Sequence, residues 1–162
     1  MDADALSRAC LDPDLAAWVE PPAGSPIAAA HRLLGQLQRG WEQGKTASFV
    51  YAPPETDDVL ALIALMLEGD PAVAEVAYWV NPAARRRGIA TSVLKLVSRW
   101  ALDDVGLERL WLEIEPENMA SHRVAARNGF QREGLLRAHC RDRPSGFRHD
   151  CVIYSLLPSD PR

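Results

Sequence analysis

Three consecutive arginines at positions 85–87 lie directly before Gly88, and their charge and spacing could bind an anionic ligand. An apolar segment ending at Val80 precedes them and a helical pattern follows from Ile89, so we expect the arginines on the first turn of a helix, where the dipole is already positive. Cations there repel one another, whereas the free N–H groups of a helix start favour an anion, and Gly88 lets it approach the backbone. The run predicts an anion site, with a solvated arginine face as the alternative.

The segments around this run follow the order of a mixed α/β domain. Ser25-Pro26 starts a helix with a serine cap and a proline in the first turn. The segments 73–80, 85–105 and 109–115 predict a right-handed strand–helix–strand unit with parallel strands, and the arginines lie beyond the carboxyl end of its first strand, where open sheets bind ligands. Further helices are expected at 2–10, 26 to about 40 and 118–128, and further strands at 47–51, 59–67, 130–141 and 149–157.

The apolar faces of the two longest helices follow from residues spaced by about 3.6 positions. The first helix is expected to bury Ile27, Ala30, Leu34, Leu37 and Trp41. The second is expected to bury Ile89, Val93, Val97 and Trp100. Strict alternation over 109–115 predicts a strand with one buried face and one polar face.

Composition narrows the class of protein. A chain of 162 residues suits a single domain over 1–162, and a net charge of -4 argues against a nucleic-acid partner. The acidic N-terminus does not resemble a signal peptide, and the longest apolar run, 59–67, is too short to span a membrane. The three cysteines lack metal-ligand spacing, which argues against a zinc site or a disulfide framework. We therefore expect a cytoplasmic protein without membrane contact.

Three motifs resemble one known family. They are Arg85-x-x-Gly88-x-Ala90 after a strand, Asn118-Met119-Ala120-Ser121 with a following Gly129-Phe130, and His149-Asp150 before Tyr154. In this order, over roughly residues 3–157, they resemble the GNAT superfamily of acetyl-CoA-dependent N-acetyltransferases, most closely its RimJ/RimL-like branch of ribosomal-protein N-terminal acetyltransferases. The resemblance implies a mixed, mostly antiparallel sheet in which one parallel strand pair splays apart, with helices on its flanks.

Acetyl-CoA is the co-substrate that the resemblance implies, with no metal. Its pantetheine arm would lie between the splayed strands ending at Val80 and near Glu115, and its pyrophosphate would lie on the N–H groups of 86–90, in agreement with the anion argument. The implied cofactor-binding residues are Trp79, Val80, Arg85, Arg86, Arg87, Gly88, Ile89, Ala90, Thr91, Asn118 and Ser121.

Acetyl transfer to an amine needs a base, because the amine must be neutral to attack. Glu113 is the first candidate, since it lies on the polar face of its strand and matches the acid of an L-E-V-like run in related enzymes. Glu75, a single acid in an apolar strand, is the second. Ion pairing is the alternative for both, with Arg109 or Lys95 as the partner of Glu113.

The leaving thiolate needs a hydrogen-bond donor, for which the family suggests Ser121. Asn118 and Ser121 also occupy the N-cap and N3 positions of a helix, where a structural role explains them equally well. The peptide N–H near Val80 could donate to the carbonyl oxygen of the thioester.

The acceptor implied by the family is a primary amine, either a protein N-terminus or a small molecule. Glu115 and Glu117 suggest an acidic rim for a cationic acceptor, although both could be ordinary surface charges. A protein of another class, a non-catalytic CoA-binding sensor or scaffold, would keep the same cofactor motifs. The sequence therefore predicts an N-acetyltransferase, with the sensor as the alternative.

Two features depart from the family or lie outside its motifs. The family's usual first strand is not found, so we expect either a truncated start or a sheet that lacks an edge strand. In the second case 47–51 would form an exposed sheet edge through which a homodimer could pair. Cys140 and Cys151 lie almost symmetrically about the turn at Gly146 and are expected to be cross-strand neighbours, as two reduced thiols in the cytosol. The four histidines are expected only in surface or hairpin packing.

Overall fold

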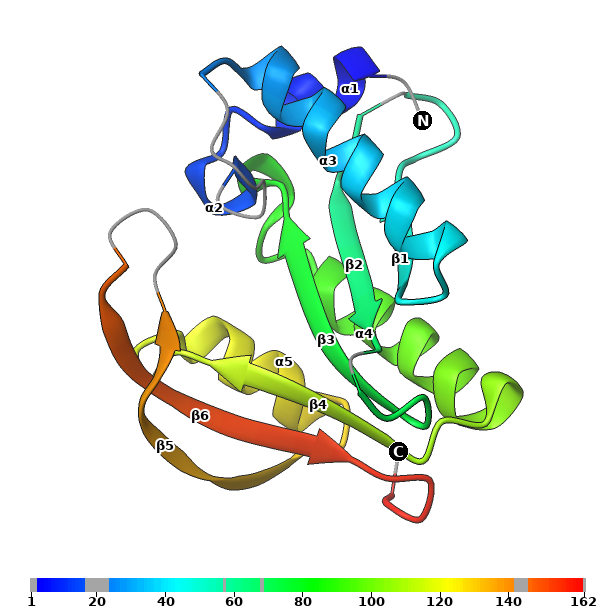
Figure 1. The fold of residues 1–162 in the computed structure, drawn as a ribbon, viewed down its shortest axis with the longest axis vertical. Helices are drawn as coiled ribbons and strands as arrows, with labels where there is room; N and C mark the ends of the chain where they lie inside the picture. Colours follow the sequence, from blue (N-terminus) through cyan, green and yellow to red (C-terminus); the bar gives the residue numbers. More distant parts are fainter. Residues whose placement is uncertain (1–2, 17–23, 57, 68, 142–145, 162) are drawn as a thin grey trace. The chain divides into compact units, whose positions relative to one another are not determined.

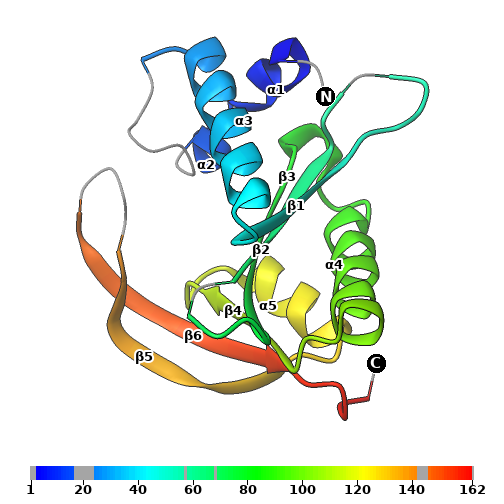
Figure 2. The ribbon, with the colours of Figure 1, turned by 45° about the vertical axis from the view of Figure 1, so that its right-hand side comes forward.

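The computed structural model describes residues 3–16, 24–56, 58–67, 69–141 and 146–161 (Figures 1 and 2). Its elements are α1 (Ala3–Ala9), α2 (Pro13–Ala16), α3 (Pro26–Glu42), β1 (Thr46–Tyr51), β2 (Ala61–Met66), β3 (Val73–Val80), η1 (Pro82–Ala84), α4 (Ile89–Arg99), η2 (Trp100–Val105), β4 (Arg109–Ile114), α5 (Met119–Arg127), β5 (Gln131–Arg141) and β6 (Arg148–Leu156). Six strands form a sheet in the order β1-β2-β3-β4-β6-β5. The pair β3–β4 is parallel, whereas β4–β6 and β5–β6 are antiparallel. This confirms the predicted mixed α/β class.

The chain divides into two compact units: Met1–Leu65 with Tyr78–Ala90, and Met66–Ala77 with Thr91–Arg162. The boundary crosses β2, β3 and α4, so contacts are described below within each unit. The prediction of one domain over 1–162 stays a prediction. None of the helices among the described residues is both long enough and apolar enough to span a bilayer.

The first unit packs α1 and α3 around a core that includes Leu6, Leu33 and Trp79. The Oγ of Ser25 accepts a hydrogen bond from the N–H of Ala28 at 3.3 Å, which confirms the predicted helix start. The predicted apolar face of α3 was partly wrong. Its buried residues are Ala29, Ala30 and Leu33, whereas Ile27 and Trp41 are 42% and 57% exposed. Ala30 is thus buried as predicted, and Leu34 and Leu37 are partly buried against the core, so only the two end positions of the predicted face were wrong.

The strand β1 is the first in the order of the sheet, so it forms an edge, as predicted. Neighbouring β2 is buried at all positions except its last, which fits the prediction of a strand covered on both faces. The predicted strand began at residue 59, and the observed one begins at Ala61.

The second unit is built on the antiparallel strands β4, β6 and β5, which lie side by side in both views (Figures 1 and 2). The strand β4 alternates as predicted: Leu110, Leu112 and Ile114 are buried and the residues between them are half-buried. Asn118 caps α5 by accepting a hydrogen bond from the N–H of Ser121, and the predicted Asn128-Gly129 stop is confirmed by a left-handed Gly129 at φ 82°.

The helix that follows the arginines buries a different face from the one predicted. Val97 is buried as expected, but the other members of the buried stripe on α4 and η2 are Leu94, Ser98, Ala101 and Leu102. The chain widens into the π-helix η2 from Trp100, which rotates the later positions, and Gly106 ends it at φ 84°.

Candidate functional site

The arginine turn, residues 85–90, does not have the predicted helical conformation. Asn81 caps the short helix η1 through its side chain, Arg85 follows with extended backbone angles, and Arg86 is left-handed at φ 64°. The helix α4 then starts only at Ile89. The placement of the arginines on the first helical turn was therefore wrong, because Asn81-Pro82 nucleates a separate turn before them.

The backbone of the arginine turn offers a row of hydrogen-bond donors. Arg86 and Gly88 both have positive φ, at 64° and 79°. Among the described residues, no hydrogen bond outside the helices and strands uses the N–H groups of residues 86–88, which are exposed. Ile89 and Ala90 are the first residues of α4, where N–H groups have no acceptor within the helix. Successive free N–H groups near a helix start form a concave anion site. The predicted role of residues 86–90 thus has a backbone suited to it, although through a loop rather than a helical turn.

The side chain of Arg85 is already engaged within the first unit. Its Nη2 lies 2.9 Å from Asp12 Oδ2 and 3.1 Å from Asp14 Oδ2, and its Nε donates to the carbonyl oxygen of Val80 at 3.0 Å. The same Asp12 oxygen accepts from the indole N–H of Trp79 at 3.1 Å. Arg85 therefore ties the arginine turn to the short helix α2, and the Trp79 side chain belongs to the core.

We expect Arg85→Ala to lower the free energy of unfolding by about 1–2 kcal/mol, because it leaves the Asp12 carboxylate, only 7% exposed, with two neutral N–H donors and without its cationic partner. Urea unfolding measures this loss. The exposed side chains of Arg86 and Arg87 provide the comparison. Their alanine variants should retain stability and weaken CoA binding, measured by calorimetry. A stable Arg85→Ala protein would contradict this assignment.

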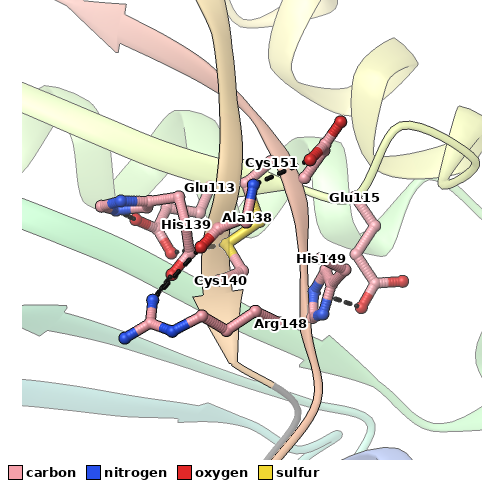
Figure 3. Close-up of a disulfide and its surroundings, with 9 residues drawn as sticks. Glu113, Glu115, Ala138, His139, Cys140, Arg148, His149 and Cys151 are labelled. Carbon is pink, nitrogen blue, oxygen red and sulfur yellow. Dashed lines mark hydrogen bonds and ion pairs between the residues drawn. A yellow bond between two sulfur atoms is a disulfide. The ribbon is translucent and has the colours of Figure 1, made fainter.

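In the second unit, the carboxylate of Glu113 lies between His139, which can donate to it, and the disulfide sulfur of Cys140, which cannot (Figure 3). Its Oε1 lies 2.8 Å from His139 Nε2, and its Oε2 lies 3.0 Å from Cys140 Sγ. The predicted alternative partner Arg109 instead pairs with Glu133, whose pKa this hydrogen bond, together with one from Ser155, lowers to about 2. Glu113 is 23% exposed, so an oriented carboxylate remains open to solvent.

A β-bulge turns His139 and Cys140 toward the same carboxylate. Two steps along β6, from Cys151 to His149, match four steps along β5, from Leu136 to Cys140. Ala138 is left-handed at φ 49° within this irregular stretch. Its N–H donates to Asp150 Oδ1, and its carbonyl oxygen and that of His139 accept from Arg148 Nη1. The extra residues allow consecutive side chains to reach one face of the sheet.

Two further polar contacts lie on the same hairpin. His149 Nε2 lies 3.3 Å from Glu115 Oε1, and the sulfur atoms of Cys140 and Cys151 form a disulfide (Figure 3). The two cysteines are neighbours as predicted, but the expectation of two separate thiols differs from the structure. Strand register explains the pairing, because Cys140 lies opposite His149 and Cys151 is two residues further along β6.

Sequence reasoning missed His139 and His149 as partners of the glutamates. The alternation of the hairpin could have placed His149 near Glu115, because both lie on the polar face of their strands. No sequence signal marked His139, since its position depends on the bulge.

The remaining predicted residues lie on other elements than Glu113. Glu75 pairs in register with Trp111 on β4 and is half-buried. Ser121 is half-buried on α5, where its N–H donates to Asn118 at 3.1 Å. No hydrogen bond within the described residues joins Ser121 to Glu113. Thr91, on the first turns of α4, is half-buried. These roles stay predictions.

A pocket of about 690 Å³ opens between α5 and the β5–β6 hairpin. His122 and Tyr154 line it and lie 3.1 Å apart, between Nδ1 and the hydroxyl oxygen. Glu113 is the register partner of Ile153, whereas the pocket is lined by Val152 and Tyr154. Because strand side chains alternate, Val152 and Tyr154 lie on the opposite face of the sheet from Glu113, whereas His149, which also lines the pocket, lies on the same face as Ile153.

Comparison with known proteins finds a matching family model and several similar proteins. A family model described as an acetyltransferase (GNAT) domain matches residues 1–131. The "Uncharacterized N-acetyltransferase p20" of Bacillus licheniformis is 24% identical over 157 residues, 96% of this chain and 87% of that protein. The structure of Mycobacterium smegmatis RimJ in complex with CoA-disulfide is 25% identical, with a TM-score of 0.79 over 96% of this chain and 77% of that one.

A second solved structure supports the fold alone. Ribosomal-protein-S5-alanine acetyltransferase from Vibrio fischeri is 21% identical and has a TM-score of 0.80, over 99% of this chain and 90% of that chain.

Proposed function

The chain belongs to the GNAT acetyltransferase family, and from this premise we propose that it transfers the acetyl group of acetyl-CoA to a primary amine. The observation that carries the proposal is the row of free N–H groups at residues 86–90, which suits a pyrophosphate. The RimJ structure similar to this chain was solved with CoA-disulfide, which supports a coenzyme A thioester as the co-substrate.

The arginine turn is the part of the chain proposed to hold the cofactor. The N–H groups of 86–90 would donate to the phosphate oxygens, and the exposed guanidinium groups of Arg86 and Arg87 would add charge. Gly88 leaves room at the centre of the row, since a Cβ built there meets no atom within 4 Å. Arg85 holds the turn in place through its ion pairs with Asp12 and Asp14.

Glu113 is proposed as the base that removes a proton from the amine. His139 orients one carboxylate oxygen from 2.8 Å, and the side chain keeps contact with solvent through which the proton can leave. The neutral amine nitrogen then attacks the thioester carbonyl to give a tetrahedral intermediate, which loses a proton from the nitrogen. The C–S bond breaks, the amide forms, and coenzyme A leaves as the thiolate, while that proton passes to the thiolate or to solvent. Ser121 is proposed as the hydrogen-bond donor to that sulfur, and Glu75 is the competing candidate for the base.

The acceptor is proposed to be cationic before it loses its proton. Glu115 is 61% exposed beside Glu113 on the polar face of β4, and Glu117 follows it. A ribosomal-protein N-terminus or a polyamine would suit these charges. Solved structures similar in fold include a spermidine N-acetyltransferase from Vibrio cholerae, at 19% identity and a TM-score of 0.71 over 88% of this chain and 80% of that one.

Three broader features belong to the same proposal. We propose that 1–162 acts as one catalytic domain, that it works in the cytoplasm, and that two copies can pair through the edge strand β1. Size-exclusion chromatography with light scattering of the wild type and a β1 variant carrying Tyr51→Lys, at the exposed end of the strand, would test the pairing.

A thiol-release assay with acetyl-CoA and a panel of peptides, polyamines and small amines tests the reaction. Turnover with at least one amine is expected, together with calorimetric binding of CoA. Binding without turnover on any amine would favour the alternative, a CoA-binding sensor. Absence of both would overturn the proposed function.

A further inference from the structure

Cys140, His149 and Cys151 form a compact group of metal-binding side chains at one end of the β5–β6 hairpin (Figure 3). One ligand atom from each residue lies within 4.8 Å of the others. We propose that this group, in its dithiol form, is a zinc site, called here the hairpin site. It does not depend on the acetyl-transfer proposal, because it rests on these three side chains alone.

Strand register brings the three side chains together. Cys140 and His149 are direct partners across the antiparallel pair, and Cys151 is two residues after His149. Residues directly opposite one another, and residues two apart on a strand, project from the same face. The expectation of no zinc site rested on the spacing of the cysteines in the sequence. That spacing is not decisive, because the hairpin places Cys140 beside the His149-x-Cys151 segment of the neighbouring strand.

The donor set favours zinc over harder cations. Two thiolates and an imidazole are ligands that zinc prefers, whereas magnesium and calcium require oxygen. With Zn–S bonds of about 2.3 Å, two thiolates on one tetrahedral zinc lie roughly 3.8 Å apart. The two sulfur atoms are bonded in the disulfide, so after reduction the side chains must move apart to this distance, and the His149 ligand atom already lies within 4.8 Å of both. Cys151 is 2% exposed, so the ion would be partly shielded from solvent.

Two carboxylates surround the hairpin site. Glu115 Oε1 lies 3.3 Å from His149 Nε2, which is the kind of contact that orients metal-binding histidines. Glu113 Oε2 lies 3.0 Å from Cys140 Sγ, so a second negative charge lies beside the site. These negative charges would offset the charge of the ion.

The disulfide and the zinc form exclude each other. A thiol or phosphine reductant supplies two electrons and two protons to the Cys140–Cys151 bond, giving two thiols. Zinc then displaces one proton from each thiol and binds both thiolates. Oxidation by a disulfide such as oxidised glutathione would re-form the bond and release the ion. Cytosolic proteins keep their cysteines largely reduced, so the dithiol form is the one that would meet zinc there.

Cobalt(II) substitution of the full-length chain tests the hairpin site. The protein is reduced, separated from reductant without oxygen, and titrated with Co²⁺, followed by competition with Zn²⁺. We expect one equivalent of Co²⁺ to produce thiolate-to-metal charge-transfer bands and intense tetrahedral d–d bands, which zinc then abolishes. The disulfide form should produce neither.

Single variants identify the ligands, and Cys10 supplies the control, since it is the remaining cysteine and lies buried in the first unit. Cys140→Ser, Cys151→Ser and His149→Ala should each lower zinc affinity by more than roughly 100-fold, the upper cost of losing a mere outer-shell partner. Cys10→Ser should bind as the wild type does. Circular dichroism verifies that each variant is folded. Zinc should raise the melting temperature of the reduced wild type but not that of the three ligand variants. Reduced wild type without thiolate bands, or a Cys151→Ser protein that binds equally well, would overturn the proposal.

Discussion

Glu113→Gln is expected to lower kcat for acetyl transfer by about 100- to 10,000-fold at neutral pH, the contribution of a positioned general base. The amide keeps the size of the side chain and can still contact His139, but it cannot take a proton from the amine. Affinity for CoA should stay within about twofold, because Glu113 lies outside the arginine turn. Steady-state thiol release and calorimetry measure the two quantities.

Two other glutamates in the same unit make this result interpretable. Glu75→Gln tests the competing base, and the large loss would move to this variant if Glu75 served that role. Glu108 is exposed and lies directly before β4, so Glu108→Gln changes the charge of the unit by the same amount without touching the proposed site. We expect both variants to retain most activity. Wild-type turnover in Glu113→Gln would exclude it as the base.

The features predicted correctly from the sequence are those that neighbouring residues determine. Alternation along β4 and the caps at Ser25 and Asn118 are set by neighbouring residues, and the structure confirms all of them. The buried face of α3 was only partly predicted, because the identity of its neighbours selects Ala29 and Leu33 over larger side chains at its edges.

The candidate site was harder to predict from the sequence, because its contacts depend on residues that are not neighbours in the chain. The choice of Glu113 needed only strand alternation and a family resemblance. Its contacts with His139 and Cys140 depend on a β-bulge near Ala138. No residue pattern in the sequence predicts how many extra residues a bulge inserts into one strand of a hairpin. The arginine turn shows the same limit, because a left-handed Arg86 follows from the preceding cap at Asn81 rather than from its own propensity.

Gly88→Ala is expected to weaken CoA binding by about 10-fold or more, equivalent to at least about 1.4 kcal/mol. Gly88 is left-handed at φ 79° and lies within the row of free N–H groups, so a methyl group there stands where phosphate oxygens would approach. The left-handed conformation also costs alanine about 1–2 kcal/mol, which lowers stability in its own right. Calorimetry and urea unfolding must therefore be compared on the same variant.

Gly106 separates these two effects. It has nearly the same backbone conformation, at φ 84°, and a Cβ built at either glycine meets no atom within 4 Å. Gly106→Ala should thus lose the same roughly 1–2 kcal/mol of stability through backbone strain alone. It ends η2, outside the arginine turn, so its affinity for CoA should match that of the wild type. Equal loss of CoA affinity in both variants would mean that strain, rather than access to the N–H groups, causes the defect, and the pyrophosphate would have to bind elsewhere.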